Sequence, residues 1–162
     1  MSLVLHPERV RHEGVAHAPI ARPARGPPRL QHQEPLIGAD ARPGLLAYLA
    51  GALNAIRDPA LEVGGVADHV HILFLLSKNV ALSAAVEELK KESSKWAKLR
   101  VHPGFYWQGG YGAFSVSASN EEKVAAYIAN QEQHHATMAF EDELRELLRR
   151  HKTEWQEDYL FG

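Results

Sequence analysis

Two histidines separated by one aliphatic residue, His69 and His71, stand at the head of an apolar run that ends at Leu76. Because side chains alternate faces along a strand, both imidazoles would project to the same side of a sheet. Two imidazoles on one face can hold a divalent cation and leave positions open for substrate oxygens. The alternative is that both are half-buried structural histidines. Two ligands are too few for a closed site, and the candidates for a third are Gln131, Asp68, His134 and His135.

Tyr127 and Gln131 lie four residues apart in a segment with helical periodicity, so they share one helix face. Taken alone, Tyr127 is a phenol of the core or of the surface. Its meaning changes if its helix lies across the strand face that carries the histidines. A phenolate beside a divalent cation could then attack a phosphodiester in line and form a covalent phosphotyrosine, which conserves the bond energy for rejoining.

The helices that would position these side chains follow from the spacing of apolar residues. One is predicted from Asp40, as N-cap, to a stop at Arg57–Pro59. A capping box of Ser119 and Glu122 is predicted to start the helix that carries Tyr127. The predicted helical ranges are 40–56, 80–99, 121–136 and 140–151.

Strands are predicted from short runs of β-branched and aromatic residues between glycine and proline signals. Residues 60–63 and 70–76 form adjacent strands, with Gly64–Gly65 as a turn or bulge between them. Residues 105–108 and 112–117 are predicted to form a hairpin around Gly109–Gly110. The predicted order is therefore one helix, two strands, one helix, two strands and two helices.

The helix at 80–99 carries a stripe of lysines at positions i, i+4 and i+7, namely Lys91, Lys95 and Lys98. Such a stripe suits contact with phosphate groups. Three acids interleave with it, so an ordinary solvated helix face is the alternative. These acids are Glu87, Glu88 and Glu92.

Composition narrows the class of protein. The chain has 162 residues and a mass of 18.0 kDa, which suits one domain, and its 45% hydrophobic content is enough for a core. With no cysteine there is no disulfide framework and no thiolate metal site, which favours a cytoplasmic protein. The apolar runs are too short to span a bilayer, and a net charge of −2 gives no global basic signature for nucleic acid.

Four separated motifs occur in order along the chain, at residues 68–73, 89–96, 107–117 and 127–135. Together they resemble the insertion-sequence 200-type single-tyrosine transposases of the HUH class, including the REP-associated tyrosine transposases. The resemblance covers residues 31–162 as one transposase domain. It implies a ferredoxin-like α+β fold, in which helices pack on an antiparallel sheet, and a homodimer.

The resemblance also implies roles for single residues. His69 and His71 would be metal ligands, Tyr127 the catalytic nucleophile and Gln131 the third metal ligand, with Mg²⁺ or Mn²⁺ as the cofactor. The implied reaction is cleavage of single-stranded DNA at hairpin-bearing transposon ends. It leaves a 5′-phosphotyrosine and a free 3′-hydroxyl that later rejoins strands. The segment expected to help build the dimer and the DNA-facing surface contains Lys90, Lys91, Lys95 and Trp96.

Residues 1–30 depart from this family. They are rich in arginine and proline, and such sequence predicts disorder, with a basic DNA-binding arm as the alternative. Members of the family open with an apolar strand beside the histidine strand, whereas residues 14–30 carry four prolines, which a central strand excludes. We therefore expect that strand to be missing, and hypothesise an aberrant start of the reading frame. Translation of the other frames upstream of Gln31 tests this.

Two further functions stay open from the sequence. A protein that lacks the first strand could bind hairpin DNA without cleaving it. A histidine-based metal hydrolase, in which Tyr127 is structural, is the other alternative, although no carboxylate base is clearly placed with the histidine pair.

Overall fold

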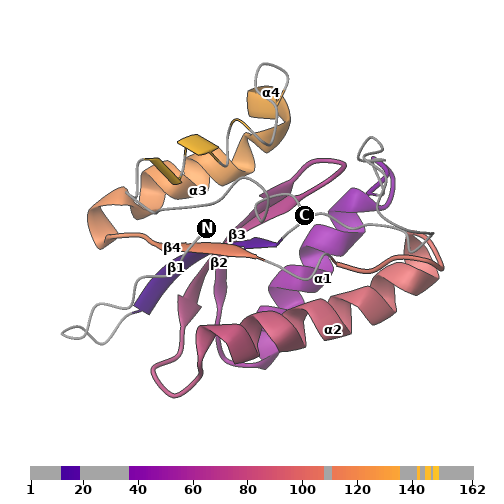
Figure 1. Ribbon diagram of the computed structural model, residues 1–162, viewed down its shortest axis with the longest axis horizontal. Helices are drawn as coiled ribbons and strands as arrows, with labels where there is room; N and C mark the ends of the chain where they lie inside the picture. The colour runs from indigo at the N-terminus through magenta and orange to yellow at the C-terminus, as the bar shows by residue number, and fades with distance from the viewer. Residues whose placement is uncertain are drawn as a thin grey trace.

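The computed structural model describes residues 12–18, 37–107 and 111–135, and five separate positions between 142 and 149. For residues 12–18, 134 and 135 it describes the backbone alone. The strands are β1 (His12–Ala18), β2 (Ala60–Gly65), β3 (Val70–Leu76) and β4 (Gly112–Ser115) (Figure 1). The helices are α1 (Arg42–Ala55), α2 (Leu82–Arg100), α3 (Glu121–Ala129) and α4 (Gln131–His135), and a 3₁₀ turn, η1 (Ala118–Asn120), precedes α3.

The described strands form one sheet in the order β2-β3-β1-β4, and every neighbouring pair is antiparallel. The helix α1 connects β1 to β2, and α2 connects β3 to β4. This β-α-β-β-α-β arrangement is the ferredoxin-like one. The α+β fold expected from the sequence is therefore confirmed.

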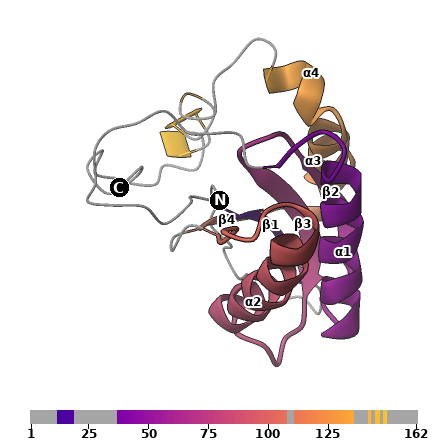
Figure 2. The same ribbon diagram turned by 90° about the vertical axis from the view of Figure 1, so that its right-hand side faces the viewer.

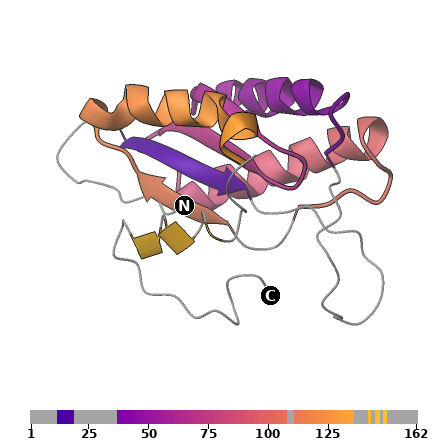
Figure 3. The same cartoon turned by 90° about the horizontal axis from the view of Figure 1, so that it is seen from above.

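The alternation of side chains along β3 divides the protein into two layers around the sheet. Val70, Ile72, Phe74 and Leu76 are buried in the core beneath α1 and α2. His71 points to the other face, where its ring meets Tyr127 of α3. Figure 1 shows α3 and α2 on opposite sides of the strands, and Figure 3 shows α3 lying over β2 and β3, the strands that it contacts.

The helices α1 and α2 lie side by side beneath the sheet (Figure 2). The rings of Tyr48 and Trp96 stack between them with centroids 5.6 Å apart. A Cβ atom at Gly44 would lie 3.1 Å from the Trp96 ring, so a glycine on α1 leaves room for the indole. Three leucines predicted to face inward are buried, namely Leu45, Leu49 and Leu53.

The end of α1 is where the sequence predicts it. Arg57 takes a left-handed conformation with φ of 64°, its amide donates to Asn54 O at 3.1 Å, and the Asp58 amide donates to Leu53 O at 3.1 Å. This pair of bonds is the Schellman arrangement. At the other end the N-cap is Ala41 rather than Asp40, with no side-chain cap.

The strand β1 corrects the expectation that no strand precedes residue 31. His12–Ala18 pairs with β3 on one side and with β4 on the other. The segment contains no proline, since the first proline after it is Pro19, so each residue can donate a backbone hydrogen bond. The four prolines of residues 14–30 all follow the end of this strand, so they do not interrupt it. An aberrant start of the reading frame stays a prediction.

Other predicted elements are also corrected. Gly64 and Gly65 are the last residues of β2 and pair with His71 and Val70, so they are neither turn nor bulge, and the irregularity lies between Ala60 and Glu62. No strand forms at Phe105–Tyr106, where Phe105 is a core residue, and β4 pairs with β1. Residues 108–110, at the centre of the predicted hairpin, lie outside the described residues.

The predicted helix at 121–136 is interrupted. Asn130 separates α3 from α4, and its side-chain amide donates to Ala126 O at 2.7 Å. The predicted capping box is absent, because η1 precedes α3 and Ser119 pairs with Ser117 at 3.0 Å. Of the predicted helix at 140–151, only five positions are described, all helical. Within the described part of the chain no helix has both the length and the apolar character to cross a membrane.

Candidate active site

The two histidines form a buried pair on the α3 face of the sheet. His69 and His71 are both 0% exposed, and their ring centroids lie 5.1 Å apart at an interplanar angle of 76°. His69 Nδ1 and Asp68 Oδ1 are 2.7 Å apart. If Nδ1 carries the proton, Nε2 is the ring nitrogen with a lone pair. A carboxylate that orients an imidazole in this way is common beside metal-binding histidines.

Tyr127 lies against His71 of this pair, so its helix crosses the strand face that carries the histidines, a condition that the sequence left open. The rings of His71 and Tyr127 have centroids 5.8 Å apart and stand at 87° to each other. Tyr127 itself is only partly buried, whereas its neighbour Ile128 is fully buried. The phenol therefore combines contact with the histidine pair and access from solvent.

Gln131 is 1% exposed and is the first residue of α4, which contacts β2. The helical turn is retained at Asn130, because its backbone amide donates to Ala126 O at 3.2 Å. Tyr127 and Gln131 therefore still lie about one helical turn apart. Arg42 of α1 forms an ion pair with Glu132 at 3.2 Å, which ties α4 to the start of α1. Of the other candidates for a third ligand, Asp68 is bonded to His69, and the side chains of His134 and His135 lie outside the described residues.

A family model for IS200-like transposases matches residues 30–131. The chain belongs to this family. A comparison with curated proteins gave no match.

Two solved structures share the fold of this transposase. One, from Deinococcus radiodurans R1, is assigned as a transposase and has a TM-score of 0.56 at 16% identity, covering 79% of this chain and 96% of its own. The other is a REP-associated tyrosine transposase bound to a REP hairpin, with a TM-score of 0.56 at 12% identity, covering 85% of this chain and 76% of its own. At these identities the likeness concerns the fold.

The buried side chains of His69, His71 and Gln131 offer two imidazoles and one amide oxygen as possible metal ligands. Among the side chains that the structure describes, no group of three or more histidines or carboxylates gathers, and Gln131 is a buried amide that could add a third ligand to His69 and His71. Imidazole and amide donors, completed by water or phosphate oxygens, suit a divalent cation such as Mn²⁺. The chemistry of these side chains therefore fits the metal that the family resemblance implies.

The lysine segment lies on the far side of the sheet from Tyr127. Lys90 Nζ lies 5.5 Å from the centroid of the Tyr111 ring, and burial lowers the pKa of Lys90 to about 8. Lys91 pairs with Glu88 at 3.0 Å, and Lys95 pairs with Glu92. The structure thus does not bring these residues to the histidine pair, and Trp96 packs between α1 and α2.

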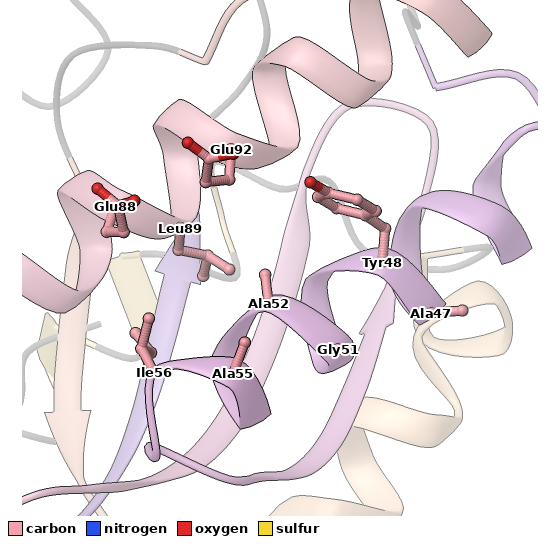
Figure 4. Close-up of a pocket in the computed structure, with 9 residues that line it drawn as sticks. All are labelled: Ala47, Tyr48, Gly51, Ala52, Ala55, Ile56, Glu88, Leu89 and Glu92. Carbon is pink, nitrogen blue, oxygen red and sulfur yellow. The ribbon is translucent and has the colours of Figure 1, made fainter.

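A surface hollow of 530 Å³ between α1 and α2 is also on this far side (Figure 4). Its walls are largely apolar or small, with Tyr48, Ile56 and Leu89 as the large side chains. Its charged residues are the acids Glu88 and Glu92. Because Lys91 and Lys95 form ion pairs with these two acids, the border of the hollow presents no excess of positive charge to a phosphate.

Proposed function

We propose that this transposase cleaves and rejoins single-stranded DNA at hairpin-bearing ends through a covalent bond to Tyr127. The observation that carries the proposal is the perpendicular contact between the His71 and Tyr127 rings, with centroids 5.8 Å apart. Strand and helix come from distant parts of the sequence and meet across one sheet face. A nucleophile beside a buried imidazole pair is an arrangement that suits metal-assisted phosphoryl transfer.

In the proposed first step, Tyr127 Oη attacks the scissile phosphorus in line. The new bond joins phosphorus to the phenolic oxygen, and the bond to the 3′-oxygen breaks. The phenolic proton passes to solvent, and the leaving oxygen takes up a proton as a free 3′-hydroxyl. Rejoining reverses these changes when a 3′-hydroxyl attacks the 5′-phosphotyrosine, so no external energy source is needed.

His69, His71 and Gln131 would hold Mg²⁺ or Mn²⁺, with Asp68 orienting the His69 ring. When bound, the cation would polarise the phosphodiester and offset charge on its non-bridging oxygens. The buried imidazole pair favours Mn²⁺ over Mg²⁺, because Mg²⁺ prefers oxygen ligands. We therefore expect higher activity with Mn²⁺ at equal concentration.

The proposed substrate is single-stranded DNA with a hairpin, and the proposed assembly is a homodimer. A REP hairpin is what the solved REP-associated relative binds, and the shared fold supports a similar ligand here. Lys90, Lys91, Lys95 and Trp96 remain proposed DNA or dimer contacts. Contacts to phosphate would make the affinity fall steeply with salt, by a log–log slope of about 0.7 per phosphate contact on a single strand.

The test uses a radiolabelled library of single-stranded DNA hairpins with randomised flanks, incubated with the full chain and Mn²⁺. The expected result is a protein–DNA adduct that survives denaturation, is absent in Tyr127→Phe and persists in the matched control Tyr111→Phe. His71→Ala is expected to abolish the adduct while leaving hairpin binding measurable. Cleavage without an adduct would contradict the proposal and favour a metal hydrolase.

The second candidate, a hairpin-binding protein without catalysis, rested on the loss of the first strand. The strand β1 occupies that place between β3 and β4, so the loss of a strand no longer supports the second candidate. A hairpin that is shifted on a native gel but never cut, with either Mg²⁺ or Mn²⁺, would restore the second candidate.

A further inference from the structure

Gly64 of β2 lies directly beneath α3. A Cβ atom at this position would lie 2.1 Å from the Ile128 carbonyl oxygen and 2.9 Å from the Ile128 carbonyl carbon. The obstacle is backbone, so no rotation of a side chain can relieve it. Ile128 is 0% exposed, which shows how closely this turn of the helix sits on the strand.

The same glycine is the partner of His71 in the sheet. Gly64 and His71 are paired across β2 and β3, and His71 contacts the ring of Tyr127, the residue before Ile128. The contact of α3 with Gly64 therefore sets the height of Tyr127 above the histidine strand. A Cβ at Gly64, 2.1 Å from the Ile128 carbonyl oxygen, would have to push α3 outward by more than about 1 Å to reach the ordinary contact distance of 3.4 Å.

The neighbouring glycine has a different role. A Cβ at Gly65 would lie 2.6 Å from His69 O and 2.9 Å from Val70 Cα, both within the same hairpin. Gly65 therefore allows the close approach of the two strands at the turn. Gly64 alone of the two faces the helix.

We propose that Gly64 is a positioning residue, which fixes the distance between Tyr127 and the histidine pair. The proposal rests on the proposed function, because that function makes this distance matter. A displacement of about 1 Å in a reacting group can lower a rate by about 100-fold. We therefore expect Gly64→Ala to slow adduct formation on the order of 100-fold, with hairpin affinity within about twofold of the parent.

The variants are made in the full-length parent chain and compared with it. Val63→Ala is the matched control, because Val63 adjoins Gly64 but packs into the core beneath α1 and α2. Gly51→Ala, where a Cβ meets nothing within 4 Å, controls for the glycine substitution itself. Folded fraction is measured by circular dichroism, and adduct rates are taken at saturating Mn²⁺ with a hairpin selected from the library.

A second measurement is independent of activity. The nuclear Overhauser contact between the ring protons of His71 and Tyr127 is expected in the parent and in Val63→Ala, and is expected to be lost in Gly64→Ala. If the parent forms no adduct, the proposed function fails, but this contact still tests the positioning.

The proposal is overturned if Gly64→Ala keeps both the adduct rate and the ring contact. It is also overturned if the rates of Gly64→Ala and Val63→Ala fall equally at equal folded fraction. Unfolding of Gly64→Ala under conditions in which Val63→Ala folds would show that Gly64 serves folding alone, and overturns it too.

Discussion

The Trp107 indole Nε1 donates a hydrogen bond of 2.8 Å to Ser93 Oγ, and the Ser93 hydroxyl donates to Leu89 O at 2.6 Å. Ser93 is 0% exposed and Trp107 is 7% exposed. This chain of bonds joins the middle of α2 to the segment that follows the helix. The Phe105 ring, 5.1 Å from that of Trp107, completes the contact and helps to place the approach to β4.

Ser93→Ala is expected to lower the free energy of unfolding by about 1–3 kcal/mol, because the buried indole N–H loses its acceptor. Urea denaturation measures the change, with the neighbouring Ser94→Ala as the control on the same helix. Equal effects of the two substitutions would mean that the hydrogen bond does not contribute to stability.

Trp96→Ala is expected to lower the free energy of unfolding by about 3 kcal/mol, since the indole fills the space between α1 and α2. Leu99→Ala, at a leucine that is 85% exposed on the same helix, is expected to cost less than about 0.5 kcal/mol. Hairpin affinity of the folded Trp96→Ala protein separates packing from DNA contact. A large loss of affinity with little loss of stability would assign Trp96 to the DNA surface.

The buried carboxyl group of Asp58 is expected to make the free energy of unfolding depend on pH. Its carboxylate is 0% exposed and accepts the Ser77 amide at 2.6 Å, and burial raises its pKa. The folded protein therefore binds the proton of the Asp58 carboxyl group more tightly than the unfolded chain does. The contribution of this protonated carboxyl group to the free energy of unfolding is lost as pH rises from about 3.8 through the raised pKa.

Asp58→Asn keeps an acceptor for Ser77 without the charge, so it is expected to gain stability relative to the parent as pH rises from 4 to 7. Thermal unfolding at several pH values measures this, with exposed Asp40→Asn as the charge control. Parallel curves for the parent and Asp58→Asn would contradict the prediction.

The partly buried Lys90 is expected to give the opposite dependence of the free energy of unfolding on pH, at higher pH values. Burial lowers its pKa to about 8 from 10.5, so between these values the unfolded chain binds more protons than the folded one. Stability should therefore rise with pH over this range through Lys90. The free energy of unfolding of the parent is expected to rise relative to that of Lys90→Met from pH 8 to pH 10. Lys98→Met, at an exposed lysine of α2, measures the effect of losing a surface charge.

Arg57→Gly is expected to raise the free energy of unfolding by about 0.5–1 kcal/mol. Relief of the left-handed strain at a φ of 64° is worth about 1–2 kcal/mol, and the added chain entropy of glycine offsets part of it. Urea denaturation is the measurement. Arg57→Ala keeps the strain and should give no such gain.

Much of the candidate site could be predicted from short patterns. The apolar run of β3 with its two histidines follows a period of two, and Tyr127 and Gln131 follow the period of a helix, so each pair could be assigned to one face from spacing. Arg57–Pro59 marked the end of α1 for an equally local reason. The order of the motifs was enough to indicate the family.

Other features depended on which segments meet in space. His12–Ala18 is short and weakly apolar, and only its pairing between β3 and β4 makes it a central strand. Gly64 read as a turn residue because a glycine pair signals a turn locally, whereas its role comes from the helix packed on it. Local sequence determined the residues that could act. Long-range packing decided that Tyr127 faces His71, because the contact depends on how closely α3 approaches β2.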